Sequence, residues 1–324
     1  MKGMKKFAAL GLVAALFSPV ASWSADAYPS KPITFVVPYP PGGTCDNVAR
    51  IVAAGVAEKL GQPVIVENRG GAGTITATEH VARSKPDGYT FLATSTPLAI
   101  NQTLYKSLTY KIPEDIKPVS LMAAVPLVMI VGESAKAKTI QDLIEEIKSR
   151  PGELTYGSSG NGGSPHLSTE MFLERIGGKM VHIPYKGSAP AVLDLIGGHT
   201  DVVIDTLFLT GQQVSAGKAR ALAQLGSTRS SLLPDVPTLQ EAGLDGYDVS
   251  SWFMLAAPSN VPQDVLEKIN TVVDEVVKSQ KVIDAFAKQG IEPKGGNIEE
   301  TTAFFNDQVE RFGAAVKRAG LTAD

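Results

Sequence analysis

The residues best suited to chemistry in this sequence lie in two glycine-rich segments, each between a predicted strand and a predicted helix. The first is Pro41–Asp46 and the second is Ser158–Ser164. A strand that passes through glycine into a helix leaves backbone N–H groups unpaired beside the positive end of the helix dipole, which suits a carboxylate or a phosphate. Hydroxyl groups of Thr44, Ser159 and Ser164 add further donors. Two such loops that face each other predict a grip on both ends of a small dianion.

Side chains that commonly perform catalysis form weaker patterns here. Cys45 follows a glycine pair at a predicted helix N-terminus, where the pKa of a thiol can fall, so a cysteine nucleophile is one interpretation. Its candidate bases are His80, His166, His182 and His199. No catalytic motif joins these residues, and a small packing residue is the simpler interpretation of Cys45. The histidines lack metal-ligand spacing, so neither a metal nor a cofactor is expected.

The elements that position the first loop alternate between strand and helix. A β-rich run at Ile33–Val37 precedes the loop, and apolar residues then recur at intervals of four from Val48 to Leu60, which is typical of a helix. A second strand, helix and strand are predicted at Val64–Glu67, Ile75–Arg83 and Tyr89–Thr94. Strands that alternate with helices indicate an α/β fold with a largely parallel sheet covered on both faces.

The same cycle recurs around the second loop. Strands are predicted at Leu154–Gly157, Met180–Ile183 and Asp201–Asp205, with helices at His166–Ile176 and Ala189–Ile196. Two cycles predict two lobes, each a mixed, largely parallel sheet flanked by helices. The lobes are joined where the apolar runs Val119–Val131 and Trp252–Ala257 cross between them. Residues 28–125 with 255–324 are expected to form a discontinuous lobe 1, and residues 126–254 lobe 2. Three C-terminal helices would return to lobe 1.

Charge and the N-terminal segment limit the classes of protein. Lys2, Lys5 and Lys6 precede the apolar run Phe7–Phe17, and small residues follow up to Ala25–Ala27, as in a secretory signal peptide over residues 1–27 that is cleaved near Ala25 to Ala27. The sequence holds 30 Lys and Arg against 33 Asp and Glu, with a net charge of −3 and no basic run, so a nucleic-acid partner is not expected. The single cysteine excludes an intramolecular disulfide. An exported, periplasmic and monomeric protein is predicted.

Seven segments of the chain, in order, resemble the Bug family, the periplasmic solute-binding proteins of tripartite tricarboxylate transporters. They include both glycine loops with Asp46, Arg50 and His166, and the stretches that follow. These are Tyr28–Ile33, Val37–Gly43, Val66–Arg69, Pro86–Thr90, Ser158–Ser164, Pro184–Gly187 and Leu233–Thr238 with Glu241–Gly243. The resemblance implies a two-lobed periplasmic binding protein of the type II-like Venus-flytrap kind. It also implies capture of a carboxylate for a membrane permease of one large and one small subunit, without catalysis.

The resemblance and the strand ends together give the candidate ligand-binding residues. They belong to the two loops and to two further strand ends, where ligands of α/β sheets commonly bind. They are Tyr39, Pro41, Gly43, Thr44, Thr94, Ser95, Thr96, Ser159, Gly162, Gly163, Ser164, His166, Asp205 and Thr206. Tyr185 and Lys186 belong to a family motif and are weaker candidates.

The identity of the carboxylate stays open at this stage. Family members take citrate-like tricarboxylates, aliphatic dicarboxylates, acidic amino acids or aromatic acids such as phthalate and terephthalate. Tyr39, Phe208 and Trp252 could form flat walls for an aromatic ring, or could equally pack in the core. The ligand predicted from the sequence is a dicarboxylate, either aliphatic or aromatic. Two alternatives are a periplasmic hydrolase that uses Cys45 and a ligand-sensing protein without a role in transport.

Overall fold

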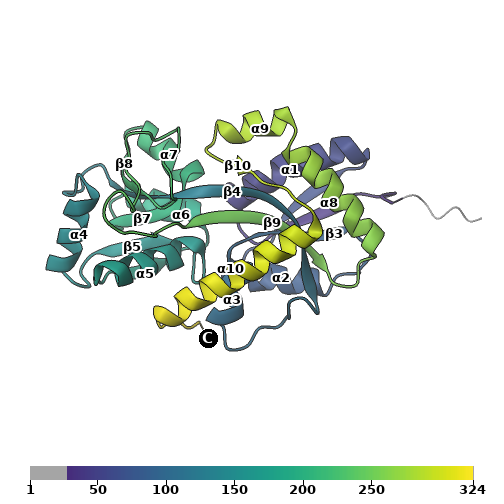
Figure 1. The fold of residues 1–324 in the computed structure, drawn as a ribbon, viewed down its shortest axis with the longest axis horizontal. Coiled ribbons are helices and arrows are strands. Elements are labelled where there is room, and N and C mark those ends of the chain that lie inside the picture. The colour runs from purple at the N-terminus through teal and green to yellow at the C-terminus, as the bar shows by residue number, and fades with distance from the viewer. Residues whose placement is uncertain (1–27, 324) are drawn as a thin grey trace, which may run out of the picture.

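A single twisted sheet forms the centre of the computed structural model, which describes residues 28–323 (Figure 1). The predicted signal peptide lies outside the described residues. The strands follow the order β2-β1-β3-β9-β4-β7-β5-β6, with β8 and β10 paired to β4 off this path. The pairs β1–β2, β1–β3, β5–β6 and β5–β7 are parallel, and the pairs made by β4 and β9 are antiparallel. The sheet is therefore mixed, with a parallel group at each end.

The first parallel group carries the first glycine loop. Its elements are β1 (Ile33–Val37), α1 (Thr44–Leu60), β2 (Val64–Asn68), the short 3₁₀ turn η1 (Ala72–Thr74), α2 (Ile75–Ala82), β3 (Thr90–Ser95) and α3 (Pro97–Leu104). Gly61 ends α1 in the left-handed conformation with φ 66°, as the sequence predicts for a glycine at that position. Helix α3, which begins at a proline, was absent from the predicted elements.

The second parallel group carries the second glycine loop. It consists of α4 (Ile140–Ser149), β5 (Thr155–Ser158), α5 (Ser164–Ile176), β6 (Val181–Pro184), α6 (Ser188–Ile196), β7 (Val202–Thr206), α7 (Leu207–Ser215) and β8 (Ala219–Gln224). The capping box predicted from Thr139 and Asp142 is present at the start of α4. Helix α7 and strand β8 had no strong sequence signal and were missed.

Two long strands join the groups. Strand β4 (Ile116–Gly132) pairs with β9 (Ser250–Pro258) as far as Pro126, and from Leu127 onward it pairs with β7 and β8. The predicted apolar run therefore continues as one strand through Pro126. The lobe limits at 125/126 and 254/255 stay a prediction.

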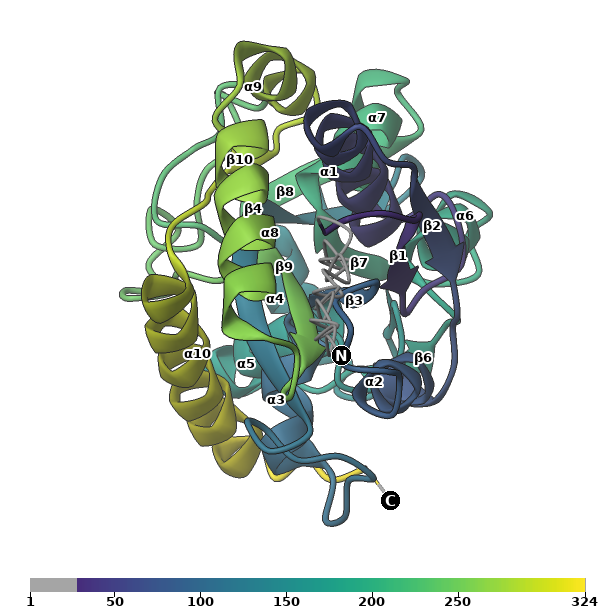
Figure 2. The ribbon, with the colours of Figure 1, turned by 90° about the vertical axis from the view of Figure 1, so that its right-hand side faces the viewer.

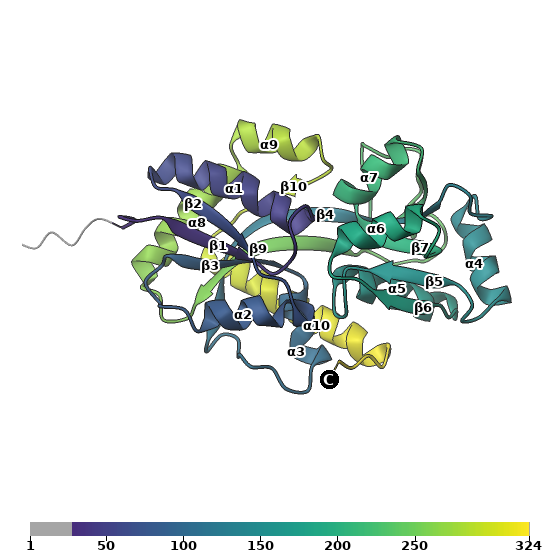
Figure 3. The ribbon, with the colours of Figure 1, turned by 180° about the vertical axis from the view of Figure 1, so that it is seen from behind.

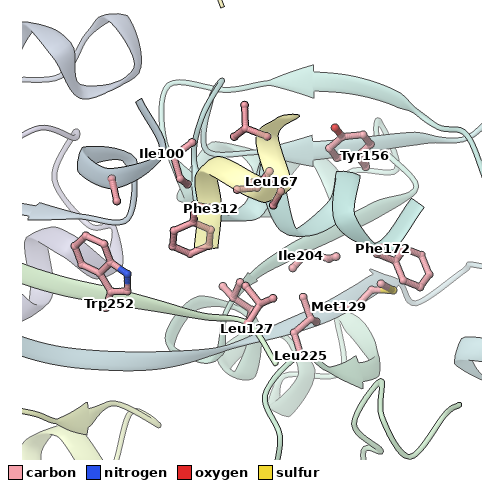
Figure 4. Packing of buried hydrophobic residues seen from close by; sticks show 14 of the residues in the cluster. Ile100, Leu127, Met129, Tyr156, Leu167, Phe172, Ile204, Leu225, Trp252 and Phe312 are labelled. Carbon is pink, nitrogen blue, oxygen red and sulfur yellow. The ribbon is translucent and has the colours of Figure 1, made fainter. Parts of the chain in front are cut away.

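Apolar side chains alternate between the two faces of the sheet and build a core on each. Val36, for example, belongs to one core cluster, whereas Phe35 and Val37 belong to the other. Helices α2, α3, α4, α5 and α10 cover the first face, and α1, α6, α7, α8 and α9 cover the second (Figures 1 and 2). Figure 4 shows the first cluster extending from Trp252 and Ile100 to Tyr156 and Phe172, so one core spans both parallel groups.

The C-terminal helices return to the first parallel group. Helix α8 (Gln263–Val277) packs on α1 and β4, α9 (Gln280–Ala287) follows it, and β10 (Glu292–Pro293) pairs with β4. Helix α10 (Ile298–Arg318) contacts α3, β4 and α5 and thus reaches both groups. Among the helices of residues 28–323, none has the length and apolar character needed to cross a membrane.

Candidate ligand-binding site

A pocket lies where the carboxyl ends of the parallel strands of both groups meet, the usual ligand position in α/β sheets. Loops after β1, β5 and β6 and the helix starts that follow them line it, together with the ends of β3 and β7 and the face of β9. The lining consists of Tyr39, Pro40, Pro41, Gly43, Thr44, Cys45, Ser95, Ser159, Ser164, Pro165, Lys186, Gly187, Ser188, Ala189, Pro190, Asp205, Thr206, Ser251 and Phe253. Figure 3 shows the N-terminal end of α1 directed toward α6 and α7.

The first loop is held in shape by the side chain of Asp46. Its Oδ2 accepts a hydrogen bond from the N–H of Gly42 at 3.0 Å, and its carboxylate also pairs with Arg50. Asn68 donates to Asp46 Oδ1 at 2.8 Å and to the carbonyl oxygen of Tyr39 at 3.0 Å. Burial raises the pKa of Asp46, but the hydrogen bonds from Arg50, Gly42 and Asn68 outweigh it and hold the pKa below its usual value. These polar contacts fix the backbone conformation of the loop, while Gly43 and Thr44 face the pocket.

The second loop is held by a buried imidazole. The N–H of Gly162 donates to His166 Nδ1 at 3.2 Å, so this ring nitrogen acts as an acceptor and the ring is neutral. Gly162 has a left-handed backbone with φ 73°, which favours glycine, and a Cβ there would lie 2.6 Å from Leu104 Cδ2. His166 itself stacks on His182 with 4.0 Å between ring centroids. These contacts place His166 behind the loop.

Three helices begin at the pocket with glycine at the N-cap. Gly43, Gly163 and Gly187 precede α1, α5 and α6, and in the described structure none of the three N-termini has a side-chain cap. The first-turn N–H groups of these helices, which Pro165 in α5 and Pro190 in α6 lack, therefore remain available to a bound anion. The sequence predicted the first two loops. The third follows the same signal, a strand, a glycine and a helix, within the Pro184–Gly187 motif, and only its lysine and tyrosine had been singled out.

One hydrogen bond joins the two parallel groups at the pocket, and another joins the second group to β9. Thr44 Oγ1 and Thr206 Oγ1 lie 2.6 Å apart, and Ser164 Oγ and Ser251 Oγ lie 3.0 Å apart. A Cβ added at Gly73 would lie 3.2 Å from the carbonyl oxygen of Asn161, which brings the loops after β2 and β5 into close approach. The arrangement is closed around the pocket.

One carboxylate belongs to the pocket lining. Asp205 is fully buried, and its Oδ1 accepts hydrogen bonds from the N–H of Thr206 at 2.7 Å and from the Thr206 hydroxyl at 3.2 Å. Burial raises the pKa of Asp205 to about 6, while Ser188 and Thr206 oppose the shift. Lys186 is the other charged side chain that the described part of the chain places in the lining, and it is exposed.

The structure places nine of the fourteen candidate residues in the lining of this pocket. These are Tyr39, Pro41, Gly43, Thr44, Ser95, Ser159, Ser164, Asp205 and Thr206. The other five lie outside the lining. Thr94 and Thr96 flank Ser95 and are fully buried, and Gly162, Gly163 and His166 shape the second loop from within. The predicted residues that line the pocket thus come from loops that were recognised by their glycines and strand ends.

The aromatic walls differ from those the sequence suggested. Tyr39 lines the pocket, and its hydroxyl lies 3.0 Å from Ser95 Oγ. Phe208 is half-buried, packs against the core on the α1 side of the sheet and lines a different pocket, and Trp252 is buried in the core covered by α10. Successive residues of a strand point to opposite faces, so Phe253 replaces Trp252 in the lining.

The chain is similar to proteins of one known family. The sequence model of the tripartite tricarboxylate transporter family receptor, TctC, matches residues 48–321. The chain belongs to this family. The receptor is 38% identical to BugT of Bordetella pertussis over 322 residues, which cover 99% of each chain.

Solved structures extend the comparison. The receptor is similar to the periplasmic binding protein BugD, with 33% identity, 92% and 100% of the two chains covered and a TM-score of 0.87. It is also similar to an R. palustris protein solved with adipate, with 35% identity, 91% and 99% coverage and a TM-score of 0.88. The predicted Bug-family membership and the two-lobed α/β binding-protein fold are therefore confirmed.

The environment of Cys45 in this receptor is unlike that of a nucleophile. Its Sγ donates a hydrogen bond to the carbonyl oxygen of Ala93 at 3.3 Å, and burial, followed by the charge of Asp46, raises the pKa of the thiol. Within residues 28–323 the pocket lining includes no histidine. His182 and His166 instead serve the second loop, because Ser158 Oγ lies 2.6 Å from His182 Nε2. The relatives are solute-binding receptors, in keeping with this environment.

The stacked histidines predict a pH-dependent stability. Burial lowers the pKa of His166 to about 4, and burial together with the neighbouring His166 lowers the pKa of His182 to about 3. The unfolded chain therefore binds more protons than the folded receptor below pH 6.5, so stability falls as the pH drops from about 6.5 toward 4. Asp205 has the opposite effect, since its pKa is raised in the folded state. Below pH 6 the folded receptor binds up to about one more proton at Asp205 than the unfolded chain does, which stabilises it as the pH falls.

Urea unfolding of a His182→Phe variant, which keeps a flat ring on His166, measures this effect. We expect the slope of unfolding free energy against pH between 4 and 6.5 to become shallower by up to about one proton, or about 1.4 kcal/mol per pH unit. The exposed His199, replaced in the same way, is the matched control. Equal slopes for wild type and His182→Phe would remove the stacked pair from the pH response.

Proposed function

We propose that this receptor is a periplasmic solute-binding protein that captures a small dicarboxylate between its lobes and delivers it to the membrane subunits of a tripartite tricarboxylate transporter. The observation that carries the proposal is the convergence of three glycine-capped helix N-termini, those of α1, α5 and α6, on one pocket. Backbone N–H groups there recognise carboxylates without a cluster of cations. The relative from R. palustris that was solved with adipate supports a carboxylate as the ligand.

The mechanism begins with an open receptor whose two lobes are residues 28–125 with 255–324 and residues 126–254. A ligand carboxylate first meets the N–H groups of one loop, and closure then brings the second and third loops onto the other end. The Thr44–Thr206 contact, which joins the two lobes, forms on closure and helps to exclude water from the pocket. The closed arrangement of a monomer is what the permease would recognise. Cleavage of residues 1–27 would release the receptor into the periplasm.

A thermal-shift screen of carboxylates tests the proposal. A ligand at about 100 times its Kd adds about 2.7 kcal/mol to the unfolding free energy, so we expect at least one of adipate, citrate and terephthalate to raise Tm by about 5 °C. Adipamide, which has the shape of adipate without its charges, is the matched control and should give no shift. The proposal would be abandoned if no di- or tricarboxylate raised Tm.

Two further experiments distinguish carboxylate transport from the hydrolase and the ligand-sensing alternatives. A Cys45→Ala receptor should keep the carboxylate-induced shift, whereas a cysteine hydrolase predicts turnover that disappears with the thiol. Uptake of the bound carboxylate by cells that lack the receptor tests the role in transport. Unchanged uptake would favour the ligand-sensing alternative.

A further inference from the structure

The turn that precedes α2 has a backbone conformation that its sequence does not favour. Gly73 has φ 59° and Thr74 has φ 80°, so two successive residues are left-handed. Glycine adopts this conformation freely, but threonine is branched at Cβ and is strained in it. Within residues 28–323, Thr74 is the only residue other than glycine with a positive φ. A strained turn persists only where its surroundings hold it, and such turns cluster at functional sites.

A buried side chain of α3 holds this turn. Asn101 is fully buried, and its Nδ2 donates to the carbonyl oxygen of Gly73 at 2.9 Å and reaches Thr74 Oγ1 at 3.4 Å. Both acceptors belong to the two left-handed residues, so the amide stabilises the strained conformation directly. Asn101 lines neither the ligand pocket nor the neighbouring cavity that Gly73 and Thr74 border. An effect of Asn101 on a bound carboxylate must therefore be indirect.

The second glycine loop packs against the same turn and the same asparagine. A Cβ built on Gly73 would lie 3.2 Å from the carbonyl oxygen of Asn161, and a Cβ built on Gly162 would lie 2.9 Å from Asn101 Oδ1. The turn and α3 belong to the first parallel group, whereas the loop belongs to the second. Two backbones approach this closely only where no side chain intervenes and each keeps its course. The contact therefore requires the turn in its observed conformation.

We propose that Asn101 is a positioning residue for ligand capture, because it holds the turn Ala72–Thr74 in the form that receives the second glycine loop when the lobes close on a carboxylate. This inference rests on the proposed carboxylate-binding function. The asparagine and the turn belong to one lobe, so the turn already has this form in the open receptor and closure does not have to strain it. Without the amide the turn would relax in the open receptor. Each binding event would then have to restore the strain, which lowers the affinity.

An Asn101→Leu receptor tests the role of the amide, since leucine has the branched shape of asparagine without its donor. Isothermal titration uses adipate, citrate or terephthalate, whichever raises the Tm of the wild type most. We expect binding to be at least about tenfold weaker, which is about 1.4 kcal/mol. Asn270→Leu is the matched control, because Asn270 is also a buried asparagine and donates to the carbonyl oxygens of Val119 at 2.9 Å and Gly296 at 3.0 Å. The control should lose stability but bind as wild type does.

A second substitution distinguishes positioning from damage to the fold. Thr74→Gly gives the turn a residue for which the left-handed conformation carries no strain. The double variant Asn101→Leu/Thr74→Gly should therefore bind at least about threefold more tightly than Asn101→Leu alone. Damage to the fold would not be repaired by removing a further buried side chain. A double variant that binds no better than Asn101→Leu would refute the role of Asn101 in holding the turn.

A glycine variant tests the contact from the other side if Asn101→Leu does not fold, as the Tm of the free receptor reports. In Gly73→Ala the added methyl group would meet the second loop at Asn161, so binding should again fall at least about tenfold. Gly61→Ala is its matched control, because Gly61 has a similar φ of 66° and open space around a built Cβ at the end of α1. This control should bind as wild type does.

The outcomes separate this inference from the proposed function. Wild-type affinity in a folded Asn101→Leu receptor, or in Gly73→Ala where that variant decides, would overturn the inference and leave the proposed function intact. An equal loss of affinity in the matched control would overturn it as well. Failure of every carboxylate to bind the wild-type receptor would instead refute the proposed function and this inference together.

Discussion

A Gly43→Val receptor is expected to fold like wild type and to bind its carboxylate at least about 100-fold more weakly, a loss of about 2.7 kcal/mol. Gly43 is the N-cap of α1 and has an extended backbone, with φ −81° and ψ 170°, which valine adopts readily. A Cβ built at this position meets no described heavy atom within 4 Å. Because Gly43 lines the pocket, the isopropyl group would occupy space that the ligand needs while the backbone N–H groups stay in place.

Titration calorimetry on the purified variant measures the loss, and the Tm of the free variant reports its folding. Gly226→Val is the matched control, since this glycine also lacks a left-handed backbone, lies outside the pocket and has its nearest neighbour 3.7 Å from a built Cβ. The control should bind as wild type does. Undiminished affinity in Gly43→Val would exclude the first loop from the site.

Gly163 would give a less direct answer than Gly43, although both are N-caps. A Cβ at Gly163 would lie 2.7 Å from Ser159 Oγ, and Ser159 is itself part of the lining. A substitution there displaces a pocket hydroxyl and the loop that carries it. The loss of binding would then combine occupied space with lost donors.

The parts of the site that the sequence predicted depend on local signals. The apolar run Ile33–Val37, the glycines at 42 and 43 and the apolar residues spaced along α1 lie within a short stretch, and each signal has a local physical cause. The same holds around Gly162 and Gly163. The predicted bounds of the strand, loop and helix are therefore close to the observed ones. The end of the sheet at which the pocket lies was predicted as well.

The parts that the sequence could not predict depend on long-range pairing. Ser251 enters the lining because β9 lies between β3 and β4, and its partner Ser164 is far away along the chain. The run from Trp252 to Ala257 is buried on both faces, so it has no alternation that would tell which residue faces the pocket. For this reason Trp252 was considered for the wall that Phe253 forms. Asp205 was predicted as a lining residue, but the hydrogen bonds that Thr206 gives to its Oδ1 depend on the fold.

The pairing of β9 with β4 places Trp252 where the two parallel groups meet. It is almost fully buried, its Nε1–H donates to Gln308 Oε1 at 3.0 Å, and Phe304 and Phe305 of α10 pack edge-on against its ring. Figure 4 shows it in the core that continues to Leu127 and Phe312. Because β4 and β9 are the strands that pass between the groups, this core supports the segment about which the lobes would move.

Trp252→Ala is accordingly expected to lower the unfolding free energy by about 3–5 kcal/mol, because it leaves a large cavity and removes the donor to Gln308. Urea unfolding monitored by circular dichroism measures the loss. Phe304→Ala, from a half-buried ring in contact with the same indole, should cost less, and the double variant should show a coupling of about 0.5–1.5 kcal/mol between the two rings. A stable Trp252→Ala receptor with impaired carboxylate binding would contradict the structure and return Trp252 to the wall of the pocket. A destabilised receptor whose folded fraction still binds the carboxylate would establish different roles for two adjacent residues of β9. Trp252 would stabilise the strands that connect the two groups, and Phe253 would border the ligand.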